Sequence, residues 1–435
     1  MHQQAFSFNT TIDVRADEIA YPRDAHEVVA LVTDARRRGL RVAATATGHN
    51  VGAYGQLDGH VLIDVRNLQT VEIDVDRRIV RVGAGVKWER VTPRLSELGL
   101  AALHGSSPDV GVAGYSLGGG IGWLSRRHGM QANAVTAIEV VLADGRHVRA
   151  DATHEPDLFW ALRGGNGNFG VVTAIEFAVF PIAELYAGAM FFPFERSRKI
   201  VHTWAAMLGD LPDELTTWIQ LMHFPEDPAL PEFLRGGSFA VVLGAFVGDE
   251  PEGARLLAPL RALGPAIDTF AMVPPSALGE LAMDPPDPLP IDLGGQLLDG
   301  LPADAVDALL DAALEAPLAM VQLRHMGGAL GRVRPGAGAR ATLPGEVCLL
   351  ALGVVLEDAM AAPVRAAIER IEHVTTPWRA GEYPNFVERP ADARGFFDDA
   401  TWSRLRAVKA AYDPGALFRG NHAIPPATEA ERLAA

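Results

Sequence analysis

The spacing of apolar residues predicts a first region of short strands and helices over residues 1–180. Residues 60–68 and 137–151 alternate apolar and polar positions as half-buried strands do, and Asp144-Gly145 is typical of a two-residue hairpin turn. Residues 22–39 instead carry apolar side chains at helical spacing and end at a glycine. This mixture predicts an α+β region built on short, mostly antiparallel strands.

The pattern of residues 187–395 predicts longer strands that alternate with helices. The strand candidates are residues 190–194, 217–224, 238–247, 319–328 and 346–356, and the helix candidates are residues 254–264, 302–316 and 363–374. The proline-rich segment 283–295 is expected to form an irregular loop that borders a site. A last helix is expected from Thr401 onward, and the residues after Pro426 are expected to form a frayed tail.

The stretch with the most unusual composition is residues 105–129, where eight of 25 residues are glycine. Ordered glycine loses conformational entropy, so this density indicates positive backbone dihedrals or a backbone that closely approaches a large, electron-rich group. Gly118, Gly119 and Gly120 precede the helix-like segment 121–127, and a glycine turn before a helix N-terminus is a typical anion site. The alternative is a glycine-rich packing turn.

Composition and charge exclude several classes of protein. The 435 residues are 49% apolar and 21% charged, which is enough material for two or three ordinary domains. A net charge of −16 argues against a nucleic-acid partner, because phosphate binding needs clustered lysine and arginine. No apolar run approaches the ~18 residues of a membrane helix. No signal peptide is expected, and Cys348, the single cysteine, is expected to be a buried inert thiol. We therefore expect a cytoplasmic protein with no membrane partner.

Two short segments match known functional motifs, but the residues around them do not support both functions. Residues 165–170 match G-x-G-x-x-G, but a helix precedes them and a strand follows, which is the reverse of a dinucleotide-binding fingerprint. Residues 114–118 match G-x-S-x-G, so Ser116 is a candidate nucleophile of a serine hydrolase. The downstream histidines that could assist it are His325, His373 and His422. No motif typical of phosphoryl transfer or of a zinc site is present, and no metal is expected.

Four separated segments carry a family resemblance when they are taken together. They are ATATGHN, GSSPDVGVAGYSLGGGIGWLSRRHGM, DLFWALRGGNGNFGVVT and, near the C-terminus, YPNF with YDPGALFRGNHAIPP. In order and spacing they resemble the FAD-linked oxidases of the vanillyl-alcohol-oxidase fold, specifically the berberine-bridge-enzyme-like branch, from about residue 19 to 426. The resemblance implies an α+β protein with a bipartite PCMH-type FAD-binding domain (1–185). It also implies a substrate domain with an antiparallel sheet and flanking helices (186–395), and a segment (396–435) that returns to the first domain.

The same resemblance implies how FAD is held. His49 matches the family histidine that attaches to the flavin 8α-methyl group, and Ser107 stands where bicovalent members have a cysteine. Only a single covalent link, at His49, is therefore expected. The residues expected to bind FAD are Thr47, Gly48, His49, Asn50, Ser107, Pro108, Val110, Gly111, Gly114, Tyr115, Gly118, Gly119, Gly120, Gly122, Trp123, Val171, Val172, Asn385 and Asn421.

The expected reaction removes a hydride from an alcohol or amine carbon of a small organic substrate, with oxygen as the expected electron acceptor. Tyr383 of the YPNF segment is the first candidate for the base or hydrogen-bond partner. On the strand 319–328 only one set of alternate residues can face the flavin, either Gln322 with Arg324 or Leu323 with His325, and the polar pair is favoured. Two alternatives remain open: a serine hydrolase, and a protein that binds FAD without turnover. The pattern indicates neither the substrate nor the oligomeric state.

Overall fold

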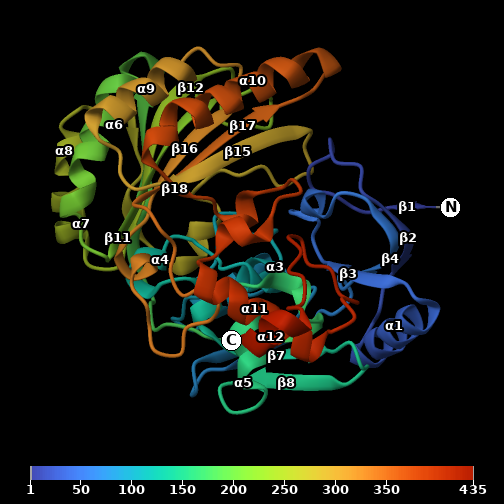
Figure 1. Ribbon diagram of the computed structural model, residues 1–435. Helices are drawn as coiled ribbons and strands as arrows, with labels where there is room; N and C mark the ends of the chain where they lie inside the picture. Colours follow the sequence, from blue (N-terminus) through green and yellow to red (C-terminus); the bar gives the residue numbers. More distant parts are fainter. Residues whose placement is uncertain (1, 435) are drawn as a thin grey trace.

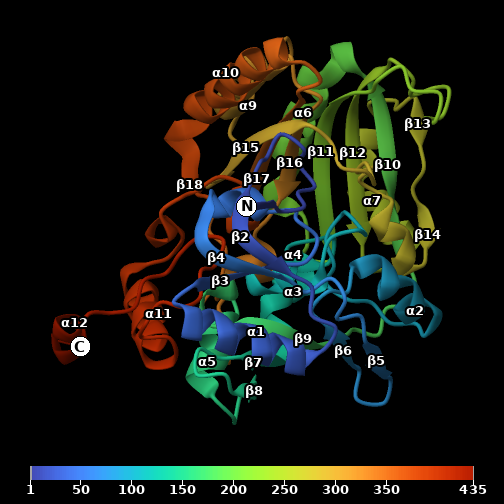
Figure 2. The ribbon, with the colours of Figure 1, turned by 90° about the vertical axis from the view of Figure 1, so that its right-hand side faces the viewer.

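The structure, a computed structural model, describes residues 2–434 and contains three sheets with helices packed around them. Figure 1 and Figure 2 show the largest sheet above the two smaller ones. The combination of helices with mostly antiparallel sheets confirms the expected α+β class.

The first small sheet is not antiparallel throughout. Its strands β1 (Gln3–Gln4), β2 (Arg15–Ala20), β3 (Arg41–Thr45) and β4 (Leu57–Asp64) lie in the order β1-β2-β4-β3. The β2–β4 and β3–β4 pairs are parallel, so the prediction of mostly antiparallel strands is wrong for this sheet. The helix α1 (Ala25–Arg38) runs between β2 and β3, and such a crossover lets successive strands run in the same direction.

The second small sheet is antiparallel, as predicted. Its strands are β5 (Val71–Asp74), β6 (Ile79–Gly83), β7 (Val135–Val141), β8 (His147–Asp151) and β9 (Val171–Ala178), in the order β5-β6-β9-β7-β8. The β7–β8 hairpin turns at Asp144-Gly145, and Gly145 has a positive φ of 89°. Short helices accompany this sheet: α2 (Thr92–Glu97), α3 (Val112–Leu117), α4 (Ser125–His128) and α5 (Pro156–Leu162).

The glycine triple follows a helix instead of leading into one. Helix α3 ends at Leu117, and Gly119 and Gly120 have φ values of 133° and 80°, which no helix contains. The next helix, α4, begins only at Ser125 and is four residues long. The prediction of an anion site at a helix N-terminus after the triple is therefore wrong.

The third sheet has nine strands. They are β10 (Leu185–Pro193), β11 (Leu215–His223), β12 (Ser238–Phe246), β13 (Ile267–Asp268), β14 (Ala271–Val273), β15 (Ile291–Leu298), β16 (Met320–His325), β17 (Val347–Val354) and β18 (Arg379–Gly381). The helices α6 (Ser197–Met207), α9 (Ala303–Ala313) and α10 (Asp358–Thr375) cover its outer face, and α7 (Glu250–Leu256) and α8 (Ala258–Arg261) lie near one edge (Figure 1).

The proline-rich segment 283–295 is an irregular loop only in its first half. From Ile291 onward the chain forms β15, which pairs with β17 along eight residues. Gly294 and Gly295 hid this strand in the sequence pattern, because glycine is uncommon in the interior of strands. A Cβ on Gly295 would lie 2.1 Å from the carbonyl oxygen of Leu349, so the close approach of the neighbouring strand requires glycine there.

The C-terminal segment packs against the first two sheets. Helix α11 (Asp399–Tyr412) is followed by an irregular stretch in which Phe418 forms a β-bridge with Val42. The expected frayed tail contains a further helix, α12 (Glu429–Ala434). The N–H of Glu431 donates to the Thr428 hydroxyl, and the Glu431 carboxylate accepts from the N–H of Thr428. This capping box is a local signal that the sequence already carries.

Candidate FAD and substrate site

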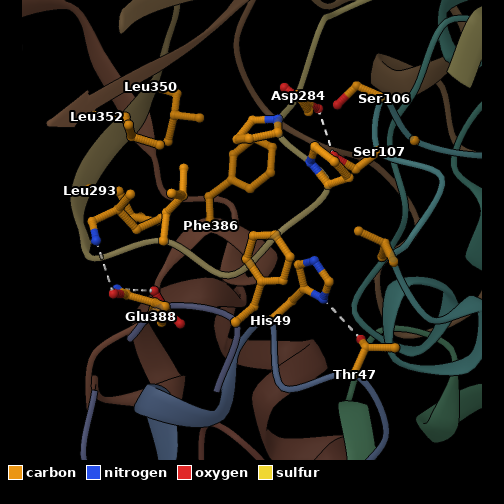
Figure 3. A pocket seen from close by; sticks show the side chains of 18 of the residues that line it. Thr47, His49, Ser106, Ser107, Asp284, Leu293, Leu350, Leu352, Phe386 and Glu388 are labelled. Carbon is orange, nitrogen blue, oxygen red and sulfur yellow. Dashed lines mark hydrogen bonds between the residues drawn. The ribbon is translucent and has the colours of Figure 1, made fainter. Parts of the chain in front are cut away.

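One cavity is lined by residues of all three sheets, and its volume of about 1490 Å³ exceeds the ~300–1,000 Å³ of most ligand pockets. One side is formed by the loop after β3 and by the glycine-rich stretch, and the other side by β15, β16 and β17. The cavity therefore has room for a large cofactor together with a substrate. Figure 3 shows part of this cavity around His49 and Phe386.

His49 lies in the cavity and is held from three directions. Its ring stacks on Phe8, with centroids 4.3 Å apart. Nδ1 lies 3.0 Å from Thr47 Oγ1, and Nε2 lies 3.2 Å from Asp109 Oδ2. Because a carboxylate accepts but does not donate, the neutral ring carries its proton on Nε2, and Nδ1 accepts from the threonine hydroxyl. Asp109 was not predicted, although it stands in the same stretch as Ser107.

The glycine-rich stretch divides into residues that line the cavity and residues that pack beneath it. Gly111 and Gly114 line the cavity, and a Cβ added to Gly114 would meet no protein atom within 4 Å. Of the glycines expected to bind FAD, Gly118, Gly119, Gly120 and Gly122 do not line it. A Cβ on Gly118 would lie 1.8 Å from Asn385 Oδ1, and one on Gly122 would lie 1.8 Å from the carbonyl oxygen of His104. These four glycines allow close protein packing and do not line the cavity, and their direct contact with the cofactor stays a prediction.

Three other expected FAD contacts also lie outside the lining of the cavity. The carbonyl of Pro108 accepts from the N–H of Glu89. Trp123 stacks on Trp218, with centroids 3.6 Å apart. Val171 is buried in the core of the second sheet, whereas its neighbour Val172 reaches the cavity. The alternation of side chains along β9 explains why only one of the two valines faces the cavity.

The remaining expected FAD contacts gather in the cavity. They are Thr47, Gly48, Asn50, Ser107, Val110, Tyr115, Val172, Asn385 and Asn421. Asn50 Nδ2 donates to the carbonyl of Pro384, and Asn421 Nδ2 donates to the carbonyl of Asn50. Asn50 Oδ1 is buried without a hydrogen-bond partner. The chain therefore contacts the His49 loop again at Pro384, which lies 334 positions after Asn50.

Ser107 connects the glycine-rich stretch to the proline-rich loop. Its hydroxyl donates to Asp284 Oδ2 over 2.7 Å, and both residues line the cavity (Figure 3). No sequence pattern pairs these two residues, which are 177 positions apart. The loop residues 283–290 therefore border the cavity, as was expected of this segment.

Register decides which residues of β16 face the cavity. Leu323 packs into the core beneath the covering helices, and His325 Nε2 lies 2.7 Å from Arg126 Nη1. Met320 and Arg324, on the opposite face, line the cavity. The expected choice of face, with Gln322 and Arg324, agrees with this arrangement, although Gln322 itself is fully buried and does not reach the cavity.

Arg324 is a buried cation, with 5% of its surface exposed. Its guanidinium lies between two aromatic rings, 4.0 Å from the centroid of Trp218 and 4.9 Å from that of Phe386. Its Nε donates to Gln322 Oε1, which fixes the side chain. Burial lowers the pKa of Arg324, but an arginine begins so high that the group stays charged.

Tyr383 lines the cavity, and its side chain is 3% exposed. Its hydroxyl oxygen accepts from the N–H of Gly120 over 2.9 Å and from Asn385 Nδ2 over 2.9 Å. Burial raises the pKa of Tyr383 to about 12. The phenol is therefore protonated at neutral pH, and its O–H is free to donate because both neighbours are donors.

Glu388 is a cavity residue that the sequence did not single out. Its Oε2 accepts from Asn9 Nδ2 over 2.9 Å, and its Oε1 has no partner (Figure 3). Burial raises the pKa of this carboxyl to about 7. Glu388 follows the YPNF segment by two residues, and a carboxylate so close to a cofactor motif is the signal that could have drawn attention to it.

Ser116 is not a nucleophile. It lies inside α3, is 0% exposed, and its hydroxyl donates to the carbonyl of Val112 over 2.7 Å. A catalytic serine must be accessible to substrate and bonded to a base. The serine-hydrolase alternative is therefore wrong.

Comparison with family models matches residues 16–151 to a FAD binding domain and residues 391–425 to the berberine and berberine like family. The chain is 33% identical to xylooligosaccharide oxidase of Thermothelomyces thermophilus over 220 residues, which is 48% of the chain and 44% of that protein. It is 27% identical to (R)-6-hydroxynicotine oxidase of Paenarthrobacter nicotinovorans over 434 residues, covering 95% of the chain and 92% of that protein.

Solved structures share the fold at lower sequence identity. Berberine-bridge-enzyme-like 1 of Physcomitrella patens superposes with a TM-score of 0.82 at 20% identity, covering 98% of this chain and 94% of that one. Berberine bridge enzyme of Eschscholzia californica superposes with a TM-score of 0.79 at 18% identity, covering 94% and 90%.

The fold and the matched segments define a FAD-linked oxidoreductase. Two segments of the chain match the FAD binding domain and the berberine and berberine like family, and the fold is that of the berberine-bridge-enzyme-like structures, as the sequence resemblance indicated.

The cavity also fits FAD on structural grounds. Gly114 and Gly167 face open space in the cavity where any Cβ would intrude, and Asn50 presents a buried oxygen that needs a donor. Thr47, His49 and Asn421 line the same region. FAD is therefore the cofactor that the family match and the residues of the cavity both support.

Two further properties concern membranes and metals. Among residues 2–434, no helix has the length and apolar character needed to span a bilayer. The described residues include one exposed trio, His2, Asp17 and Asp58, whose ligand atoms lie within 4.8 Å of one another. This trio lies among exposed residues that do not line the cavity.

Proposed function

We propose that the protein oxidises a small organic alcohol or amine with FAD, using oxygen as the electron acceptor. The observation that carries this proposal is a single cavity that brings the His49 loop, Tyr383 and Arg324 together. Relatives named as a xylooligosaccharide oxidase and a hydroxynicotine oxidase support the two substrate classes. When bound, FAD supplies the chemistry of accepting a hydride and passing on its electrons.

We propose that residues 1–185 and 396–435 hold FAD and that His49 attaches to it through Nδ1. The support is the Asp109 carboxylate, which faces Nε2 at 3.2 Å and leaves Nδ1 as the unprotonated nitrogen. A neighbouring carboxylate also makes an imidazole a better nucleophile. Ser107 has no sulfur, so His49 would be the single point of attachment.

We propose that Tyr383 and Arg324 act on the reacting atoms and that Gln322 positions Arg324. Tyr383, protonated at neutral pH, would donate a hydrogen bond to the oxygen or nitrogen of the substrate, so its role is hydrogen bonding in preference to proton abstraction. The buried Arg324 would balance negative charge that develops near it. We also propose a cytoplasmic location, which the single cysteine supports, since one cysteine cannot form an internal disulfide.

Acid precipitation tests the proposed attachment. We expect the purified wild-type protein to keep its yellow colour in the acid pellet, whereas His49→Ala releases FAD into the supernatant while its circular dichroism spectrum is unchanged. Asp109→Asn should lower the fraction of attached flavin, since the ring is then no longer held in one tautomer. If the precipitated wild-type protein is run on a denaturing gel and its band shows no flavin fluorescence, the covalent link is contradicted.

Reduction of the flavin tests turnover itself. Anaerobic bleaching of the flavin absorbance by an alcohol or an amine, followed by recovery and hydrogen peroxide release on admission of air, is the expected result. A flavin that stays oxidised with every compound tried would instead identify a protein that binds FAD without turnover.

A further inference from the structure

The side of the cavity formed by the large sheet is apolar. We define the apolar wall as Ile291, Leu293, Met320, Leu350 and Leu352, all of which line the cavity. Register makes the wall continuous, because Leu352 of β17 lies opposite both Leu293 of β15 and Met320 of β16. The wall lies on the face of the sheet opposite α9 and α10, since the alternate residues Leu349 and Ala351 pack into the core beneath those helices.

Glu388 lies beside this wall, and only one of its two carboxylate oxygens has a hydrogen-bond partner. Asn9 is 4% exposed, and its Oδ1 accepts from the N–H groups of Thr11 and Ile291, which fixes the orientation of the amide. Asn9 Nδ2 therefore points to Glu388 Oε2, and Glu388 Oε1 remains buried without a partner. Figure 3 shows Glu388, Leu293, Leu350, Leu352 and Phe386 around the same space.

The apolar wall and the single free carboxylate oxygen disfavour a sugar as the substrate. A sugar carries a hydroxyl on most of its carbons, and a hydroxyl that leaves water without gaining a partner costs about 1–3 kcal/mol. The apolar wall offers no side-chain donor or acceptor to such hydroxyls. One buried carboxylate oxygen next to an apolar surface matches a ligand with one cationic group and an apolar body.

The charges around the cavity agree with a cationic ligand. Arg324 is the buried cation of the cavity, and its guanidinium lies between the rings of Trp218 and Phe386 and is held by Gln322. Four further carboxylates line the cavity: Asp227, Glu280, Asp284 and Asp287. The net field therefore attracts a cation, and Glu388 offers it a free oxygen.

We propose that the substrate is an apolar amine whose ammonium group is bound by Glu388 Oε1 while its hydrocarbon body lies against the apolar wall. The proposal rests on the proposed FAD-dependent oxidation and selects amines from the two classes left open there. In the oxidation the ammonium group would first pass one proton to the Glu388 carboxylate, and the neutral amine would then lose a hydride from the carbon next to nitrogen to the flavin and leave as an iminium ion. Oxygen would take the hydride's two electrons and its proton, together with the proton held by Glu388, to form hydrogen peroxide.

A pair of compounds with the same shape tests the inference on the flavin-loaded protein. 4-Phenylbutylamine and 4-phenylbutan-1-ol differ in one polar group, and their binding is followed anaerobically at pH 8 from the change in the flavin absorbance spectrum. We expect the amine to bind at least tenfold more tightly than the alcohol. Glu388→Gln, which keeps an oxygen for Asn9, should weaken amine binding by roughly tenfold or more and leave alcohol binding within about twofold.

A matched variant separates local binding from general charge. Asp287→Asn removes one carboxylate from an exposed position of the cavity lining and should change amine affinity by less than about twofold. Equal binding of amine and alcohol, equal losses in Glu388→Gln and Asp287→Asn, or reduction of the flavin by xylobiose but not by the amine would overturn the inference. Absence of FAD, or a flavin that no compound reduces, would instead contradict the proposed function. If FAD is bound but not reduced, the comparison of amine and alcohol binding still tests the inference about Glu388.

Discussion

At the scale of single residues, the cavity holds one carboxyl group, that of Glu388, whose burial lowers the folding stability. Burial raises the pKa of the Glu388 carboxyl to about 7 and leaves Oε1 without a partner. An acid with a raised pKa in the folded state keeps its proton between pH 4.5 and about 7, where the unfolded chain has already lost it. Folding stability is therefore lost as the pH rises through this window. Such a cost is typical of residues that serve binding or catalysis.

Glu388→Gln should therefore stabilise the protein at high pH. Glutamine keeps the hydrogen bond with Asn9 and cannot ionise, so we expect a gain of about 2 kcal/mol at pH 8 and about a quarter of that gain at pH 5. Thermal unfolding at the two pH values measures the difference, expected as roughly 2–4 °C at pH 8. A gain of the same size at both pH values would show that ionisation of Glu388 is not its cause.

At the scale of elements, α11 fastens the C-terminal segment to the first two sheets. Lys409 Nζ lies 2.6 Å from Asp413 Oδ2, and both side chains are 1% exposed. Lys409 also donates to the carbonyls of Asn168 and Phe418, and Asp413 accepts from the N–H groups of Leu417 and Phe418. The ion pair thus joins the helix, the glycine loop near Asn168 and the segment that carries Asn421.

Breaking this buried pair should be far more damaging than breaking an exposed one. Lys409→Met leaves Asp413 charged and buried without its cation, and we expect a loss of about 3–5 kcal/mol in the free energy of unfolding. Arg404→Met, which breaks the exposed pair with Asp157, should lose less than about 1 kcal/mol. Urea unfolding of both variants makes the comparison, and similar losses would show that the buried pair does not fasten the segment.

At the scale of the whole molecule, one cavity lies between the three sheets. The cavity of about 1490 Å³ touches residues from the His49 loop to β17. A ligand that binds there contacts the folded protein only, so it stabilises the arrangement of all three sheets by mass action. Val172 and Gly167, which line the cavity, lie in the second sheet and in the loop before β9.

FAD should therefore stabilise the whole chain, and more strongly than a truncated flavin. In the His49→Ala protein, where FAD is exchangeable, FAD at about 100 times its dissociation constant should add about 2.7 kcal/mol to the free energy of unfolding. Riboflavin at the same concentration should add clearly less, since it lacks the pyrophosphate and adenosine. Chemical unfolding with each ligand measures both values, and equal effects would place the adenosine end outside the cavity.

The local pattern of the sequence determined the classes of element, the hairpin at Asp144-Gly145 and the face of β16 that carries Arg324, because helix and strand periods act over neighbouring residues. The family segments determined the cofactor and the position of His49. The tertiary structure decided which glycines meet the cavity and which, like Gly118, meet another part of the chain. It also decided that Asp109 faces His49 and that Asn9 holds Glu388. Such contacts join residues up to several hundred positions apart, so no local period records them.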